Sequence, residues 1–344
     1  MSANTAAHLD LNAVEAWCRE NVDGFQGPIE LHKFSVGQSN PTFRLTTPSG
    51  RYVLRRKPPG TLLKSAHAVD REFRVQKALY ETDVPVARMY ALCEDESVIG
   101  SMFYIMDCVE GRRFEDPCLP ELPKGERMAY LDEMCRVLTT VHDVDIEAVG
   151  LSDYGPPGNY YERQINRWAK QYEASKTTEL PEMDDLTDWL KSNIPPDDGQ
   201  RTLVHGDYRI DNMLFHPQEP RVAALLDWEL STIGHPYADL AAVIMQWSMP
   251  PGTESKGMGG VDRAAEGLIT DEEFVARYCE RRGISGIDGF GFYLAFTFFR
   301  MAGIIQGVLK RAIDGNASNP ERAFRLGEAV PRFAQAGLAA ARTV

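Results

Sequence analysis

Several features that mark large protein classes are missing from this sequence of 344 residues. It has no basic excess: 37 Lys and Arg stand against 50 Asp and Glu, a formal net charge of -13. This argues against a nucleic-acid binder, because such binding depends on basic side chains that neutralise phosphates. The six cysteines form no Cys-x-x-Cys pair, so free thiols in a reducing cytoplasm are the simplest interpretation.

The sequence also lacks a long hydrophobic run without polar interruption. The most apolar stretch, residues 290–309, contains Arg300 and Gln306 and is typical of a buried helix, not of a membrane span. The first residues are polar and lack the apolar segment of a secretory signal. We therefore expect a cytoplasmic protein with no membrane partner; the oligomeric state is not readable from the sequence.

Secondary-structure patterns divide the chain into a strand-rich first third and a helix-rich remainder. Five strands are expected, at residues 29–36, 42–47, 51–56, 87–93 and 101–106. Helices are expected at residues 10–22, 65–81, 125–143, 160–176, 183–193, 236–248, 271–283, 288–313 and 320–341. This order predicts an α+β fold of two lobes, residues 1–107 and 108–344.

The most informative motif is His-Gly-Asp-Tyr-Arg-Ile-Asp-Asn at residues 205–212, followed by Asp227. Its His-x-Asp-x-x-x-x-Asn spacing is the catalytic-loop pattern of the kinase fold, with Gly206 where protein kinases carry Arg. Phosphoryl transfer needs one carboxylate for the proton of the attacking hydroxyl. It also needs an amide oxygen and a second carboxylate for Mg²⁺. Asp207, Asn212 and Asp227 could supply these groups.

The spacing between Asn212 and Asp227 predicts a β-hairpin. Residues 213–215 and 222–226 are short apolar strands, separated by the turn His-Pro-Gln-Glu-Pro. Such a hairpin returns the chain beside its start, and so brings Asp227 close to Asn212.

A second group of candidates lies in the strand-rich third. Arg55 is on the third strand and shares a face with Val53. Glu72 interrupts an apolar face of the following helix. A carboxylate on an inward face needs a cationic partner, and Arg55 is a plausible one.

Together these residues resemble the aminoglycoside phosphotransferase and choline kinase-like family of small-molecule kinases. The specific part is His-Gly-Asp-Tyr-Arg-Ile-Asp-Asn with Leu-Leu-Asp-Trp-Glu at 225–229; the resemblance covers roughly residues 25–310. Residues 52–60 and 65–72 are similar to a branch associated with acyl-CoA dehydrogenases, some of whose members act on hydroxyacyl-CoA compounds. The resemblance implies a two-lobed protein-kinase-like fold with a small five-stranded antiparallel first lobe. It also implies an ATP- and Mg²⁺-dependent phosphotransferase acting on a small-molecule hydroxyl.

The resemblance further implies a role for each matching residue. Asp207 would be the catalytic base, and Asn212 and Asp227 the Mg²⁺ ligands. Arg55 would replace the usual lysine, with Glu72 as its partner. The adenine would meet the hinge at Met106, Asp107 and Val109, and the phosphates would lie under Gly37, Ser39 and Asn40. His205 and Asp239 are interpreted as structural, and Glu229 as a second metal ligand or a partner of a neighbouring side chain.

Two departures from the kinase pattern matter. Arg at position 55 is planar and bidentate where Lys is a point charge. Asp-Trp-Glu replaces Asp-Phe-Gly, and no activation segment follows, which speaks against a protein kinase. The alternatives left open are an aminoglycoside or choline-type acceptor and a nucleotide-binding pseudokinase. For a cationic acceptor the candidates are Glu182, Asp184 and Asp185; for hydroxyacyl-CoA they are Arg163, Arg167 and Arg209. A metal-dependent hydrolase would need further ligands near His205 and Asp207, and the sequence shows none at suitable spacing.

Overall fold

The computed structural model describes residues 9–34, 40–58, 68–252, 256–317 and 319–344. The chain groups into two compact units, each assembled from separate segments. The first unit comprises residues 1–113, 147–151 and 211–231, and the second comprises residues 114–146, 152–210 and 232–344. The lobe boundary expected at residue 107 stays a prediction. The compact grouping adds residues 211–231, with Asn212 and Asp227, to the first unit.

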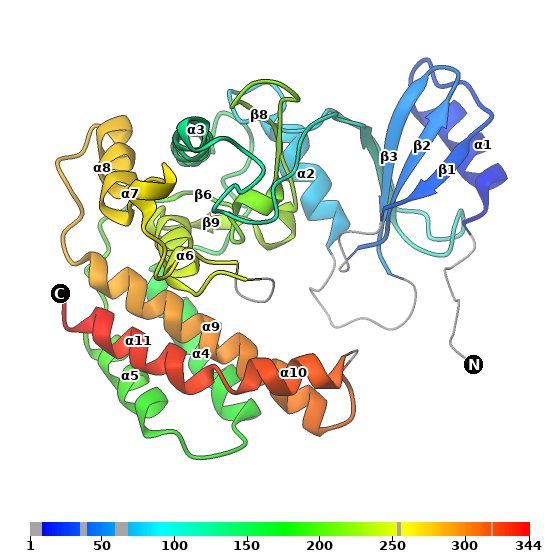
Figure 1. Ribbon diagram of the computed structural model, residues 1–344. Helices are drawn as coiled ribbons and strands as arrows, with labels where there is room; N and C mark the ends of the chain where they lie inside the picture. The colour runs from blue at the N-terminus through cyan, green and yellow to red at the C-terminus, as the bar shows by residue number, and fades with distance from the viewer. Residues whose placement is uncertain (1–8, 35–39, 59–67, 253–255, 318) are drawn as a thin grey trace. The chain divides into compact units, whose positions relative to one another are not determined.

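The first unit contains the predicted five-stranded antiparallel sheet, in the order β1-β2-β3-β5-β4 (Figure 1). Its strands are β1 (Glu30–Lys33), β2 (Thr42–Thr47), β3 (Gly50–Arg56), β4 (Met89–Cys93) and β5 (Phe103–Asp107). The two helices of this unit are α1 (Leu11–Asn21) and α2 (Val69–Leu79). The strand prediction is confirmed: each of the five apolar runs pairs antiparallel with a neighbour, with one register shift between Met89 and Ala91 in the β4–β5 pair.

Side chains alternate along β3, so each face of the sheet packs against a different helix. Tyr52 and Leu54 pack in one apolar cluster with Val14 and Cys18 of α1. On the α2 side, Val69 and Phe73 pack with Met89 and Tyr104. Arg55 follows Leu54 directly, so its side chain lies on the face of the sheet opposite the α1 cluster.

A second, smaller hairpin belongs to the first unit. Strands β7 (Met213–Phe215) and β8 (Val222–Leu225) pair antiparallel, with Met213 opposite Leu225. Short 3₁₀ turns flank it, η1 (Ile210–Asn212) before β7 and η2 (Trp228–Leu230) after β8. The hairpin predicted between Asn212 and Asp227 is therefore confirmed.

The second unit is mostly helical and contains one antiparallel pair of short strands, β6 (Thr202–Val204) and β9 (Thr232–Gly234). Its helices are α3 (Lys124–His142), α4 (Tyr160–Ser175), α5 (Pro181–Ser192), α6 (Tyr237–Ser248), α7 (Arg263–Glu266), α8 (Asp271–Arg282), α9 (Phe290–Ile313), α10 (Pro320–Gly327) and α11 (Val330–Ala341). The mostly helical character expected for this part of the chain is confirmed.

Helix α9 is the centre of the second unit (Figure 1). Its Phe292, Phe296 and Phe299 join residues of α4, α5 and α11 in one buried cluster. By length and composition α9 could cross a membrane, but 61% of its most apolar window is buried inside the protein. The helix therefore has the burial of a core helix, as the sequence predicts.

One helix prediction is wrong. A single helix was expected over residues 320–341, but α10 ends at Gly327 and α11 begins at Val330. Pro331 at the second position of α11 has no N–H to donate to the preceding turn. It is tolerated at a helix start, so the chain forms two helices there instead of one.

Candidate active site

The catalytic-loop motif begins where β6 ends, in the second unit. His205 is fully buried, and its Nδ1 accepts a hydrogen bond from the Asp207 backbone N–H at 3.3 Å. Gly206 has φ of +84°, a conformation that residues with a Cβ rarely adopt. Glycine is therefore favoured at this position of the loop. His205 thus has the structural role predicted for it, and it fixes the backbone that carries Asp207.

Asp239, at the start of α6, binds the backbone of the same loop. Its two carboxylate oxygens accept hydrogen bonds from His205 N at 2.7 Å and Gly206 N at 2.9 Å. Burial opposes its charge, but His142, His205 and these donors outweigh burial and lower the pKa of Asp239. A charged, buried carboxylate bonded to two successive amides makes the loop rigid. The interpretation of Asp239 as a structural residue is confirmed.

The two expected metal ligands lie together in the first unit. Leu226 N donates to Asn212 O at 2.7 Å, so Asn212 is beside the residue that precedes Asp227. Asp227 itself has φ of 65° and ψ of 59°, the left-handed region. Few non-glycine residues adopt this conformation, although Asp does so more readily than most, and strained residues of this kind cluster at active sites. Trp228 is fully buried, and its Nε1 donates to Leu225 O at 2.9 Å, which anchors the turn after Asp227.

Arg55 is surrounded by carboxylates. Its Nε lies 3.0 Å from Glu72 Oε2, close enough for an ion pair although not aligned as a hydrogen bond. Its Nη2 donates to Asp227 Oδ1 at 2.6 Å and lies 4.0 Å from Glu229 Oε2. The pairing predicted between Arg55 and Glu72 is confirmed. The contacts with Asp227 and Glu229 are additional to what the sequence indicated.

The charges of this group follow from burial and from crowding of carboxylates. Burial opposes the charge of Arg55, but Glu72, Asp227 and Glu229 together raise its pKa. Glu72 is 2% exposed, and burial raises its pKa to about 7. Arg55 works against this increase, whereas Asp227 and Glu229 add to it by repulsion. One guanidinium thus faces three carboxylates. Glu72, the most buried of the three, retains its proton up to near-neutral pH.

The remaining candidates for nucleotide binding fall in the same unit. Asn40 is fully buried, and its Nδ2 donates to Glu229 Oε2 at 3.4 Å. Gly37 and Ser39 lie outside the described residues. At the expected hinge, Met106 and Val109 pack against the α2-side cluster, and Asp107 N donates to Arg88 O at 2.8 Å. Their proposed contact with adenine stays a prediction.

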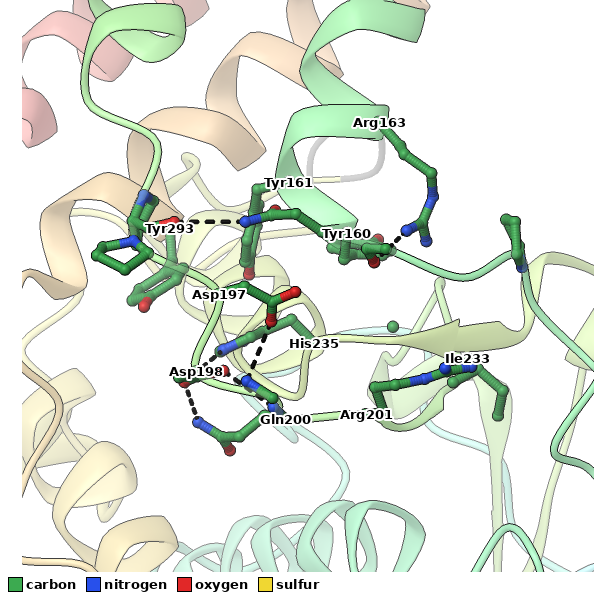
Figure 2. Close-up of a pocket in the computed structure, with 17 residues that line it drawn as sticks. Tyr160, Tyr161, Arg163, Asp197, Asp198, Gln200, Arg201, Ile233, His235 and Tyr293 are labelled. Carbon is green, nitrogen blue, oxygen red and sulfur yellow. Dashed lines mark hydrogen bonds and ion pairs between the residues drawn. The ribbon is translucent and has the colours of Figure 1, made fainter.

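A cavity of about 190 Å³ in the second unit is lined by both acidic and basic side chains (Figure 2). The loop that precedes β6 supplies Asp197 and Asp198, and Asp198 Oδ2 lies 3.3 Å from His235 Nε2. Arg163 also lines it, but its Nη1 donates to the carbonyls of Pro157 and Gly158. The cavity lies at the N-terminal end of β6, whereas Asp207 follows the C-terminal end of that strand. We therefore do not place the acceptor hydroxyl in this cavity.

Sequence reasoning missed one residue of the catalytic loop's surroundings, Arg300. Its Nη2 donates to Gly206 O at 3.3 Å, directly before Asp207. Its guanidinium carbon lies 5.9 Å from the centre of the Trp168 ring, and that of Arg167 lies 5.8 Å from it. The available signal was that Arg300 is the only charged residue between Phe290 and Leu309. A charge in so apolar a helix calls for a specific partner.

A site with these residues implies a bound Mg²⁺ ion. Among the described residues there is no group of three or more His, Cys, Asp or Glu side chains that could hold a metal ion. One carboxylate on Asp227 and one amide on Asn212 nevertheless suit Mg²⁺, which takes few protein ligands and fills the rest with water and nucleotide phosphates. The residues therefore fit a nucleotide-borne Mg²⁺ and not a metal held by protein alone.

The five-stranded sheet, the helical second unit and the loop containing Asp207 define a kinase-like fold. The sequence profile of the phosphotransferase enzyme family (APH) matches residues 30–290. The chain therefore belongs to the APH phosphotransferase family, and the predicted resemblance is confirmed.

Three relatives illustrate the extent of the likeness. The chain is 42% identical to the mouse acyl-CoA dehydrogenase family member 11 over 96% of this chain but 43% of that protein. A Ralstonia eutropha protein provisionally assigned as an aminoglycoside phosphotransferase has a crystal structure with TM-score 0.89 and 50% identity, covering 97% of this chain and 99% of that one. A thermostable aminoglycoside phosphotransferase APH(4)-Ia variant, in complex with ADP and hygromycin B, shares the fold at 17% identity and TM-score 0.61, covering 94% and 99%. The chain thus spans less than half the length of the curated relative that it matches.

Proposed function

We propose that this phosphotransferase uses ATP and Mg²⁺ to phosphorylate a hydroxyl group of an anionic small molecule, such as a hydroxyacyl-CoA or a hydroxy acid. The main support for nucleotide use is the Arg55 guanidinium, held between Glu72 and Asp227 in the unit that also contains Asn212. The planar, bidentate guanidinium matches the geometry of phosphate as well as of carboxylate, so a fixed arginine is suited to phosphate binding. The bound ADP of the fold relative described above agrees with the proposal.

The proposed chemistry assigns a separate task to each residue. The acceptor oxygen attacks the γ-phosphorus, the bond to the β,γ-bridging oxygen breaks, and ADP leaves. The hydroxyl proton passes to the Asp207 carboxylate and from there to solvent. Asp227 and Asn212 would hold Mg²⁺, which offsets the negative charge on the phosphate oxygens when bound. Arg55 would bind the α- and β-phosphates, and Glu72 orients it.

The preference for an anionic acceptor rests on the charges of the second unit. Arg300 and Arg167 flank Trp168, and Arg300 bonds to the peptide next to Asp207. Of the three acidic residues that a polycationic aminoglycoside could use, Glu182 and Asp184 have partners within the second unit, whereas Asp185 is exposed. Asp184 Oδ1 is 3.3 Å from Lys176 Nζ, and Glu182 Oε1 accepts from Gln335 Nε2 at 3.1 Å.

The first experiment is an ATP-to-ADP turnover assay with Mg²⁺ on wild type and Asp207→Ala. The acceptor panel contains 3- and 4-hydroxyacyl-CoA esters, free hydroxy acids, aminoglycosides, choline and sugars. Asp207-dependent turnover with the anionic acceptors alone is the expected result. Turnover with aminoglycosides or choline would refute the acceptor class, and ATP binding without any turnover would identify a pseudokinase.

Replacement of Arg300 with methionine separates acceptor binding from nucleotide binding. We expect Arg300→Met to raise the KM of an anionic acceptor about tenfold, because a hydrogen bond to a charged group contributes about 1.5–3 kcal/mol. The KM for ATP should not change. Arg311→Met is the matched control, because Arg311 is an exposed arginine on the same helix. An unchanged acceptor KM in steady-state kinetics would remove Arg300 from the acceptor site.

A further inference from the structure

Glu229 contacts Arg55 and Asn40 through one of its carboxylate oxygens. Its Oε2 lies 4.0 Å from Arg55 Nη2 and accepts a hydrogen bond from Asn40 Nδ2 at 3.4 Å. The side chain of Glu229 is 21% exposed, compared with 29% for Asp227 and 2% for Glu72. Glu229 is thus a partly shielded carboxylate whose Oε2 faces the outer end of the Arg55 side chain.

The Arg55 head has one end with a single carboxylate partner and one end with two possible partners. Glu72, from helix α2, holds the Nε end at 3.0 Å. At the other end Nη2 contacts Asp227 at 2.6 Å and has Glu229 as its next carboxylate. Because guanidinium is a planar fork of several donors, a small rotation about the Nε end moves Nη2 from one carboxylate toward the other.

Arg55 and a divalent cation would compete for Asp227. Asp227 Oδ1 already has a guanidinium nitrogen at hydrogen-bond distance. A cation bound to that carboxylate would repel the guanidinium, since like charges a few ångströms apart are strongly unfavourable where solvent is excluded. Binding of Mg²⁺ to Asp227 therefore favours movement of the guanidinium away from Asp227 and toward another carboxylate.

We infer that Glu229 is a positioning residue that receives Arg55 when a divalent cation binds Asp227. The inference rests on the proposed nucleotide function of the same unit. In the structure Arg55 pairs with Glu72 and Asp227. With a cation on Asp227 it would pair with Glu72 and Glu229 and stay directed at the phosphates. Asn40 donates a hydrogen bond to the same Glu229 oxygen, so this exchange would also affect the Asn40 side chain.

The test is the effect of Mg²⁺ on binding of the non-hydrolysable nucleotide AMP-PNP, measured by isothermal titration calorimetry with and without Mg²⁺. We expect Glu229→Gln to reduce the Mg²⁺-dependent gain in affinity about tenfold and to change metal-free affinity less than threefold. Glu219→Gln is the control, because Glu219 is 59% exposed and lies in the turn of the β7–β8 hairpin of the same unit. It should behave as wild type.

A second background distinguishes positioning from direct metal binding. The double variant Arg55→Met/Glu72→Gln lacks the Arg55 guanidinium. It also lacks the Glu72 carboxylate, which would otherwise be left buried without a cationic partner. If Glu229 acts through Arg55, adding Glu229→Gln to this background has no further effect on the Mg²⁺ gain. An equal tenfold loss in both backgrounds would show a direct metal ligand and overturn the inference, as would no loss in either. Failure of wild type itself to bind AMP-PNP would overturn the proposed function as well.

Discussion

Asp207→Ala is expected to lower kcat by about three to four orders of magnitude and to leave nucleotide affinity within about twofold of wild type. General-base removal accounts for losses of about 10²–10⁴, and the loss of hydroxyl alignment adds to this. The nucleotide-binding residues that we propose belong to the first unit, and Asp207 belongs to the second. Single-turnover kinetics and AMP-PNP titration measure the two quantities separately.

The control for Asp207→Ala is Asp188→Ala, an exposed aspartate on α5 of the same unit. Its kcat should equal that of wild type. Circular dichroism should be unchanged in both variants, because the loop backbone is held through Asp239 and not through the Asp207 carboxylate. A kcat for Asp207→Ala within tenfold of wild type would exclude Asp207 as the base.

Arg55→Met is expected to destabilise the protein by about 3–5 kcal/mol at pH 8, the usual cost of removing one partner of a buried ion pair. Glu72 is 2% exposed and loses its cation in this variant. The double variant Arg55→Met/Glu72→Gln should recover most of the loss, because no charge is left buried without a partner. Urea denaturation monitored by tryptophan fluorescence measures the free energy of unfolding of all three proteins.

The pH dependence of this destabilisation follows from the pKa of Glu72. In the folded wild type that pKa is raised to about 7, so the favourable contribution of protonated Glu72 is complete below its ordinary pKa and is lost as pH rises to about 7. Above pH 7 the wild-type carboxylate ionises beside Arg55, whereas the variant has no cation to accept that charge. The stability difference between wild type and Arg55→Met should therefore widen as pH rises above 7.

Arg51→Met is the matched control on the same strand. Arg51 pairs with Glu110 at the surface, where both side chains are largely exposed, and such pairs contribute little. Its stability should follow that of wild type at every pH. A difference between Arg55→Met and wild type that narrows with rising pH would contradict the buried-carboxylate explanation.

Much of the fold was predictable because it depends on short-range patterns. Strand β2 begins and ends at the residues predicted, and α1, α2 and α3 lie within a few residues of the expected bounds. The two-residue alternation of side chains in strands and the 3.6-residue period of helices are both local. They can therefore be recognised from neighbouring residues in the sequence. The break between α10 and α11 was missed because a proline allowed at a helix start looks the same in sequence as one inside a helix.

The sequence by itself determined the spacing of Asp207, Asn212 and Asp227, the hairpin that returns the chain to Asn212, and the inward carboxylate of Glu72. Each depends on residues within one or two elements. Only the tertiary structure decided that Arg55 pairs with Asp227, 172 positions away, and that Arg300 bonds to Gly206. These contacts depend on which faces of distant elements come together when the core forms. That choice is made by burial and packing of the whole chain, and no local pattern records it.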